Sequence, residues 1–178
     1  MYAPKGIGAL YVIKGTAIQN IMFGAGQEGG IRPGTENMVH IVALGKACGI
    51  ALRDGEKNRV AMQNTRDNLL SGLRAHLGNS FVLNNVSEQS LPNTLSIAFP
   101  GVEAHKLTAH IGGEVFLSTG SACHADSIEI SPVLKAMQLD ASIASSTLRI
   151  STGKYTTPEE VDKAARVIAE AVLQLRAG

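Results

Sequence analysis

The stretch TLRISTGKYTTPEE, residues 147–160, decides the fold class of this chain. Its first five residues predict a short strand in which Arg149 lies between the apolar side chains of Leu148 and Ile150. The four residues that begin at Thr157 form a capping box with proline at the first helical position, which is typical of a helix start. Apolar residues then continue at helical spacing to the C-terminus: Val161, Ala164, Ile168, Ala171, Val172 and Leu175.

Strand and helix patterns also alternate upstream of this stretch. Asp54-Gly55 and Gly78 act as stop signals that separate the helical patterns, and Ser131-Pro132 is a helix start. We therefore expect an α+β fold, a small antiparallel or mixed sheet of three or four strands covered by helices on one face. Helices are expected over 36–53, 57–76, 103–111 and 132–137, and further strands over 94–99 and 115–117.

The first 35 residues differ from the rest. Residues 7–13 are a short apolar run that predicts a buried strand, and residues 23–35 contain five glycines, which predict a loop. Such a strand and loop are not a complete folding unit. We expect residues 1–35 to be a remnant of a larger domain and residues 36–178 to be a C-terminal small domain. The open apolar strand would pair with a second copy or be poorly ordered.

Composition excludes several classes of function. The 178 residues carry 16 Lys+Arg and 15 Asp+Glu, so the formal net charge is only +1 and no basic surface for nucleic acid is expected. No apolar run is long enough to span a membrane. The start of the chain lacks the apolar core of a secretory signal, and two cysteines fit a reducing compartment. These features predict a cytoplasmic protein without a membrane or nucleic-acid partner.

Cys123 is the first candidate for chemistry. It lies among small polar residues that predict an exposed loop, and a nucleophilic thiol needs such exposure. His124 and Asp126 are near enough in sequence to influence its ionisation. A surface cysteine without a role remains an equal alternative. Cys48, in an apolar helical pattern, is expected to be an inert core residue.

Arg149 is the second candidate. An arginine in a central strand needs an anionic partner, which could be a structural carboxylate or the carboxylate of a substrate. From the residues alone, structural pairing is favoured.

The segment RPGTEN, residues 32–37, is the third candidate. It delivers backbone N–H groups and a hydroxyl to the start of a helix, which is a natural anion or phosphate site. The alternative is that Thr35 is simply a helix N-cap. The glycine spacing matches neither a Walker loop nor a dinucleotide fingerprint, and the histidine and cysteine spacings predict no metal site.

Taken together, the chain resembles the C-terminal half of the cysteine desulfurases that depend on pyridoxal phosphate and of their relatives, the selenocysteine lyases. These are class V aminotransferase-type enzymes of fold type I. Four motifs carry the resemblance in the right order. They correspond to the strand after the cofactor lysine, the loop that reaches the neighbouring subunit's cofactor, the catalytic-cysteine loop, and the substrate-carboxylate strand with the final helix: residues 2–12, 26–37, 118–123 and 148–160.

The resemblance implies roles for three residues. Cys123 would be the nucleophile that takes sulfur or selenium from L-cysteine or L-selenocysteine, leaving alanine. Arg149 would hold the substrate carboxylate, and Thr35 would touch the cofactor phosphate of a partner subunit in a homodimer. The sulfur would pass to an acceptor protein, as in iron–sulfur cluster assembly. The run from Cys123 to Asp126 leans toward selenocysteine lyases.

The sequence also departs from the family. The lysine that forms the Schiff base with the cofactor would directly precede Met1, and Ala3, Ala25 and Gly29 differ from the usual residues. We therefore expect residues 1–178 alone to bind no pyridoxal phosphate and to be inactive. Two alternatives stay open. The chain could be a cofactor-free sulfur carrier that uses Cys123, or an interaction module.

Overall fold

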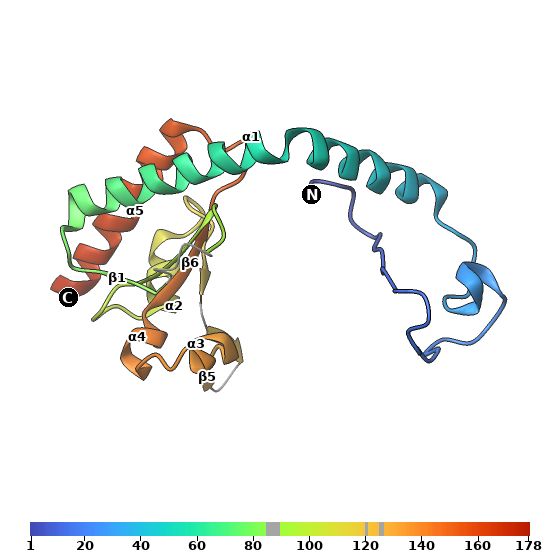
Figure 1. The fold of residues 1–178 in the computed structure, drawn as a ribbon. Helices are drawn as coiled ribbons and strands as arrows, with labels where there is room; N and C mark the ends of the chain where they lie inside the picture. Colours follow the sequence, from blue (N-terminus) through green and yellow to red (C-terminus); the bar gives the residue numbers. More distant parts are fainter. Residues whose placement is uncertain (85–89, 120, 125–126) are drawn as a thin grey trace. The chain divides into compact units, whose positions relative to one another are not determined.

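The computed structural model describes residues 1–84, 90–119, 121–124 and 127–178 (Figure 1). By its internal contacts the chain divides into two compact units, Met1–Glu56 and Lys57–Gly178. The expected boundary, between residues 35 and 36, separates a strand-and-loop remnant from a small domain, and that assignment stays a prediction. The two units are described in turn.

The second unit is built on an antiparallel sheet of four strands in the order β1-β2-β6-β3. The two central strands pair over their full length, from Thr94 opposite Ser151 to Ala98 opposite Thr147. A separate two-stranded hairpin, β4-β5, follows β3 in the chain. The strands are β1 (Val82–Leu83), β2 (Thr94–Ala98), β3 (Ser118–Thr119), β4 (Ser121–His124), β5 (Ser127–Ile130) and β6 (Thr147–Ser151).

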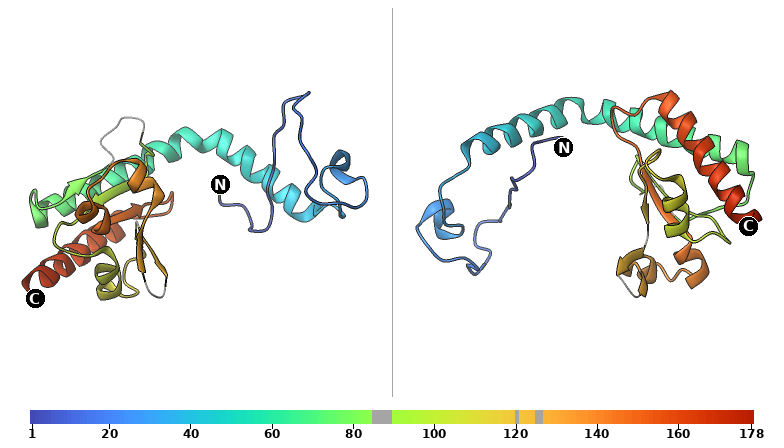
Figure 2. Two further views of the ribbon diagram at one scale, coloured as in Figure 1. Left: turned by 90° about the horizontal axis from the view of Figure 1, so that it is seen from below. Right: turned by 180° about the vertical axis from the view of Figure 1, so that it is seen from behind.

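Helices cover one face of this sheet (Figure 2). The core lies between that face and three helices, the C-terminal part of α1 (Met38–Leu77), α2 (Ala104–Ile111) and α5 (Pro158–Ala177). In β6 the buried Leu148 and Ile150 alternate with the exposed Arg149 and Ser151. This alternation leaves the opposite face of the sheet polar. Two short helices complete the unit: α3 (Pro132–Ala136) and α4 (Ala141–Ser145).

The expected α+β fold, with a small antiparallel sheet and helices on one face, is confirmed. The elements with the clearest local signals are found where they were expected. In the capping box of α5, Thr157 Oγ1 accepts from the Glu160 N–H at 3.3 Å and Glu160 Oε2 accepts from the Thr157 N–H at 2.8 Å. At the start of α3, Ser131 Oγ accepts from the Val133 N–H at 3.2 Å.

Two expected helices, 36–53 and 57–76, are wrong, because α1 is a single helix from Met38 to Leu77. Asp54-Gly55 lies inside it. A glycine within a helix costs only about 1 kcal/mol relative to alanine, and no proline is present to remove a hydrogen bond. Stop signals made of one glycine therefore do not end a helix whose neighbours on both sides favour it.

The strand expected over 115–117 is also wrong. Val115 and Leu117 pack against the core without strand pairing, Phe116 is 92% exposed, and regular pairing begins only at Ser118. The loop expected around Cys123 contains strands β4 and β5 in its described residues. Small polar residues give no hydrophobic alternation, so the sequence pattern could not reveal this backbone pairing.

The first unit contains little regular structure before α1. A short 3₁₀ helix, η1 (Gln27–Gly30), interrupts the glycine-rich loop. Residues 7–13 do not form the expected strand, because a strand needs a partner for its N–H and C=O groups and residues 1–56 offer none. Cys48 was expected in the core and is exposed; in the part of α1 that belongs to this unit, only Ala47 is a buried apolar residue.

Candidate functional site

Arg149 lies on the polar face of the sheet, in the central strand β6. Ser96 of β2 is opposite it on one side and Ser118 of β3 is opposite it on the other. Arg149 Nη2 donates to Ser118 Oγ at 3.4 Å. Among the side chains that the structure describes, no carboxylate pairs with Arg149. The structural ion pair that the sequence favoured is absent there, because the exposed guanidinium needs no buried counter-charge.

Cys123 follows the strand that contacts Arg149. It lies in β4, with its Cα opposite that of Ile128 in β5. Its side chain and that of His124 are outside the described residues, as is Asp126. Cys123 comes five positions after Ser118, and a fully extended chain covers roughly 3.5 Å per residue, so their Cα atoms are within about 18 Å. The backbone of Cys123 therefore lies within about 18 Å of Ser118, the residue that contacts Arg149.

Thr35 belongs to the first unit, in the loop before α1. The alternative that it caps this helix is wrong. Asn37 is the capping residue, since its Oδ1 accepts from the His40 N–H at 3.3 Å and contacts His40 Nδ1 at 2.9 Å. No hydrogen bond of the Thr35 hydroxyl is found among the described residues, so this hydroxyl remains available to a ligand.

Side chains from the same loop hold the residue before Thr35. Gly34 has φ +99°, a left-handed conformation that favours glycine. Gln27 Oε1 accepts from the Gly34 N–H at 3.0 Å. Arg32 Nη1 donates to the Gly34 carbonyl at 3.0 Å and to the Thr35 carbonyl at 3.4 Å. The backbone of Gly34 and Thr35 is thus held on both sides of the Gly34 Cα, at the Gly34 N–H and at the two carbonyls.

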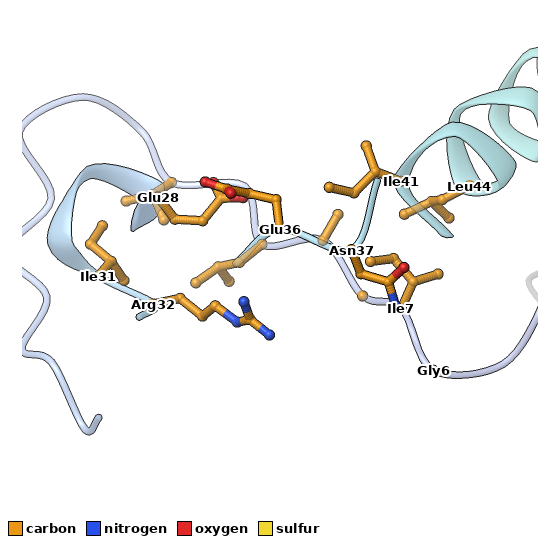
Figure 3. A pocket seen from close by; sticks show the side chains of 13 residues that line it. Gly6, Ile7, Glu28, Ile31, Arg32, Glu36, Asn37, Ile41 and Leu44 are labelled. Atoms are coloured by element: carbon orange, nitrogen blue, oxygen red, sulfur yellow. The ribbon is translucent and has the colours of Figure 1, made fainter. Parts of the chain in front are cut away.

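A cavity of about 600 Å³ lies beside this loop, between residues 6–12 and the first turns of α1 (Figure 3). Its lining is apolar at Ile7, Ile41 and Leu44 and charged at Glu28, Arg32 and Glu36. The Arg32 guanidinium points away from the carboxylates of Glu28 and Glu36 in Figure 3. Within the described part of the chain, no carboxylate pairs with Arg32.

Two carboxyl groups with lowered pKa values lie away from these residues. A hydrogen bond from Lys106 lowers the pKa of Glu103, and hydrogen bonds from its own backbone N–H and from Thr157 lower the pKa of Glu159. Both carboxylates are at helix N-termini, where a negative charge is favoured. Over the described ranges, no group of three acidic, histidine or cysteine residues could hold a metal ion, and no helix is long and apolar enough to cross a membrane.

Residues 1–164 match the family model of class-V aminotransferases. The chain belongs to this family. The resemblance read from the four sequence motifs is confirmed, and the relatives are cysteine desulfurases.

Three relatives illustrate the match. The cysteine desulfurase NifS of Azotobacter vinelandii is 37% identical over 177 residues, which are 99% of this chain and 44% of that protein. The cysteine desulfurase IscS of Shewanella loihica is 39% identical over 178 residues, 99% of this chain and 43% of that protein. A mitochondrial cysteine desulfurase of Arabidopsis thaliana is 36% identical over 178 residues, which are 99% of this chain and 39% of that protein. The chain spans less than half the length of these relatives.

Solved structures give the same result. A NifS-like protein superposes with a TM-score of 0.77 at 35% identity, over 90% of this chain and 40% of that one. The NifS-like protein from Rickettsia africae superposes with a TM-score of 0.72 at 25% identity, over 92% and 41%.

Sequence reasoning singled out Arg149, Cys123 and Thr35, whose roles stay predictions, but it did not assign the contacts of the side chains around Arg149 and Thr35. Ser118 became a neighbour of Arg149 only through the pairing of β3 with β6, which no local pattern reveals. Gln27 and Arg32 lie within the motif of residues 26–37, but no sequence pattern indicated their contacts with Gly34 or Thr35.

Proposed function

We propose that residues 1–178 supply the substrate-carboxylate site and the sulfur-accepting cysteine of a cysteine desulfurase. The observation that carries the proposal is the exposed Arg149, which has no carboxylate partner among the described side chains and borders the strand that leads to Cys123. Arg149 would bind the α-carboxylate of L-cysteine with its planar fork.

Cys123 would accept the sulfur. Its thiolate attacks the sulfur atom of the substrate, an S–S bond forms, and the C–S bond of the substrate breaks. The electron pair of that bond goes to the substrate carbon, which takes up a proton and becomes the methyl group of L-alanine. L-cysteine and the Cys123 thiol thus give L-alanine and a Cys123 persulfide, with no external oxidant or reductant. An acceptor protein, such as one that assembles iron–sulfur clusters in the cytoplasm, would receive this sulfur.

The family's cofactor, pyridoxal phosphate, supplies an electron sink for the amino acid when it is bound. The loop around Thr35 fits its phosphate, because the Thr35 hydroxyl is available and Arg32 adds a positive charge without a carboxylate partner among the described residues. In a homodimer, Thr35 would bind the phosphate held by the other copy. In the family the cofactor also needs a lysine that forms its Schiff base, so the proposal is tested in a complete enzyme.

The test uses a complete enzyme in which residues 1–178 replace the matching region of Azotobacter vinelandii NifS. We expect this chimaera, loaded with pyridoxal phosphate, to release alanine from L-cysteine. Arg149→Ala should raise KM about tenfold to hundredfold, since a charge-assisted pair with the carboxylate is lost. Cys123→Ser should abolish persulfide, measured by mass spectrometry of the alkylated protein.

Cys48→Ser is the matched control, because Cys48 is the other cysteine and is exposed on α1. Persulfide on Cys48, or alanine release that survives Cys123→Ser unchanged, would contradict the proposal. The alternative of a cofactor-free carrier makes the opposite prediction. Residues 1–178 without cofactor would take up sulfur on Cys123 from a low-molecular-weight persulfide, whereas an interaction module would take up none.

A further inference from the structure

In the loop before α1, two side chains bind the backbone of Gly34 and Thr35, and the proposed function uses only the Thr35 hydroxyl. Gln27 binds the N–H of Gly34 at 3.0 Å, and Arg32 binds the carbonyls of Gly34 and Thr35 at 3.0 and 3.4 Å. Both side chains come from earlier in the loop and hold its last residues before α1.

The conformation of Gly34 explains why the hydrogen bonds from Gln27 and Arg32 are needed. Glycine at φ +99° adopts other backbone conformations as readily, so the direction of the Thr35 side chain is not fixed by the chain itself. Beyond the Arg32 guanidinium, nothing except its chain neighbours would lie within 4 Å of a Cβ at position 34, so packing does not fix it either. The side-chain hydrogen bonds are therefore what determines where Thr35 points.

Arg32 is suited to this task in a way that lysine is not. Its planar guanidinium presents several N–H donors in fixed directions, and one nitrogen here reaches two successive carbonyl oxygens. A lysine ammonium keeps the charge but has no fixed donor geometry. The charge and the positioning can thus be separated by one substitution.

We propose that Arg32 and Gln27 are positioning residues that hold the backbone of Gly34 and Thr35 so that the Thr35 hydroxyl meets a phosphate group. This inference rests on the proposed function, in which Thr35 binds the phosphate of pyridoxal phosphate. A purely structural loop would stabilise the fold without changing the selectivity for a phosphorylated ligand.

The experiment compares two ligands of the same chimaera, pyridoxal phosphate and pyridoxal, which lacks the phosphate. Dissociation constants are measured by fluorescence titration for Arg32→Lys, Gln27→Met, Thr35→Val and the double variant Arg32→Lys/Thr35→Val. Arg53→Lys is the matched control, since Arg53 pairs with its neighbour Asp54 on the exposed surface of α1.

We expect Thr35→Val and Arg32→Lys each to weaken the binding of pyridoxal phosphate by about tenfold, the effect of losing a hydrogen bond to a charged group. Gln27→Met should also weaken the binding of pyridoxal phosphate, because it removes the acceptor of the Gly34 N–H. Pyridoxal binding should stay unchanged in all variants. The double variant should bind no more weakly than Thr35→Val, since both changes remove the same contact.

Three outcomes would overturn the inference. One is equal loss of pyridoxal and pyridoxal phosphate in Arg32→Lys and Gln27→Met, which indicates general damage to the loop. The second is full additivity in the double variant. The third is unchanged phosphate selectivity in Thr35→Val, Arg32→Lys or Gln27→Met. Alanine release from L-cysteine is assayed separately, in the variants of Arg149 and Cys123. Failure of the proposed function can therefore be told apart from failure of this inference. A chimaera that binds no cofactor would contradict both.

Discussion

The two units of this chain bury their apolar side chains to very different extents. In Lys57–Gly178, residues from three helices and two strands form one continuous core. In Met1–Glu56, the apolar side chains of Leu10, Tyr11 and Phe23 are more than three-quarters exposed, and Ala47 is the only buried apolar residue. Burial of apolar surface is the main favourable term in folding, so the core supports the stability of the second unit, whereas the first unit buries too little apolar surface to gain much from this term.

Helix α1 allows this difference to be tested with two identical substitutions. Leu73 is 0% exposed in the core of the second unit, and Leu52 is 91% exposed in the first. We expect Leu73→Ala to lower the free energy of unfolding of residues 1–178 by about 2–5 kcal/mol, because it leaves a cavity. Leu52→Ala should change it by less than about 0.5 kcal/mol. Urea denaturation followed by circular dichroism measures both, and similar losses would refute the comparison.

Two glycines of α1 predict effects of opposite sign. A Cβ at Gly72 would lie 2.8 Å from the Cβ of Ala165 in α5, whereas nothing lies within 4 Å of a Cβ at Gly49. Gly72→Ala should therefore destabilise by about 1–2 kcal/mol through overpacking. Gly49→Ala should stabilise its part of the helix by roughly 0.5–1 kcal/mol. Thermal melts and amide hydrogen exchange along α1 separate the two, and a stabilising Gly72→Ala would show that α1 and α5 do not approach closely.

The N-termini of α1 and α5 should differ in how their contribution to stability changes at low pH. This is the smallest of the expected effects. Asn37 caps α1 with an uncharged amide, while the pKa of Glu159 at the start of α5 is lowered by its hydrogen bonds. A lowered pKa means that Glu159 stabilises the fold above its unfolded-state pKa, and that this contribution is lost as the pH falls through the lower, folded-state pKa. Glu159→Gln should flatten the acid limb of the stability profile, measured by urea denaturation at several pH values. Asn37→Ser should leave its shape unchanged, and an unaltered acid limb in Glu159→Gln would count against the assignment.

The sequence predicted those elements whose signals are local. Strand β6 and helix α5 follow from one stretch of 14 residues, residues 147–160, because the capping box and the apolar spacing act within a few positions. Strands β4 and β5 were missed because small polar residues give no hydrophobic alternation. The pairing of β3 with β6 was missed because a hydrogen bond between distant segments leaves no mark on either of them, and β1 was missed because it has only two residues. Helix α1 was divided because a glycine was given more weight than its small cost in a helix.

The candidate site divides in the same way. The sequence identified Arg149, Cys123 and Thr35 through their residue types and motifs, and their roles stay predictions. It could not decide whether Thr35 caps a helix, because Asn37 two residues later is an equally good cap. Only the hydrogen bond from His40 to Asn37 resolved the choice.

The polar face of the sheet has a consequence for mutational studies. Arg149 and Ser151 alternate with buried neighbours but support no core themselves. Their replacement should leave the abundance of the protein in cells nearly unchanged, whereas replacement of Leu148 or Ile150 should lower it. A saturation library of β6 scored for both abundance and growth would therefore separate two kinds of selection at neighbouring positions. Substitutions at the exposed positions would affect growth alone, and those at the buried positions would affect abundance as well.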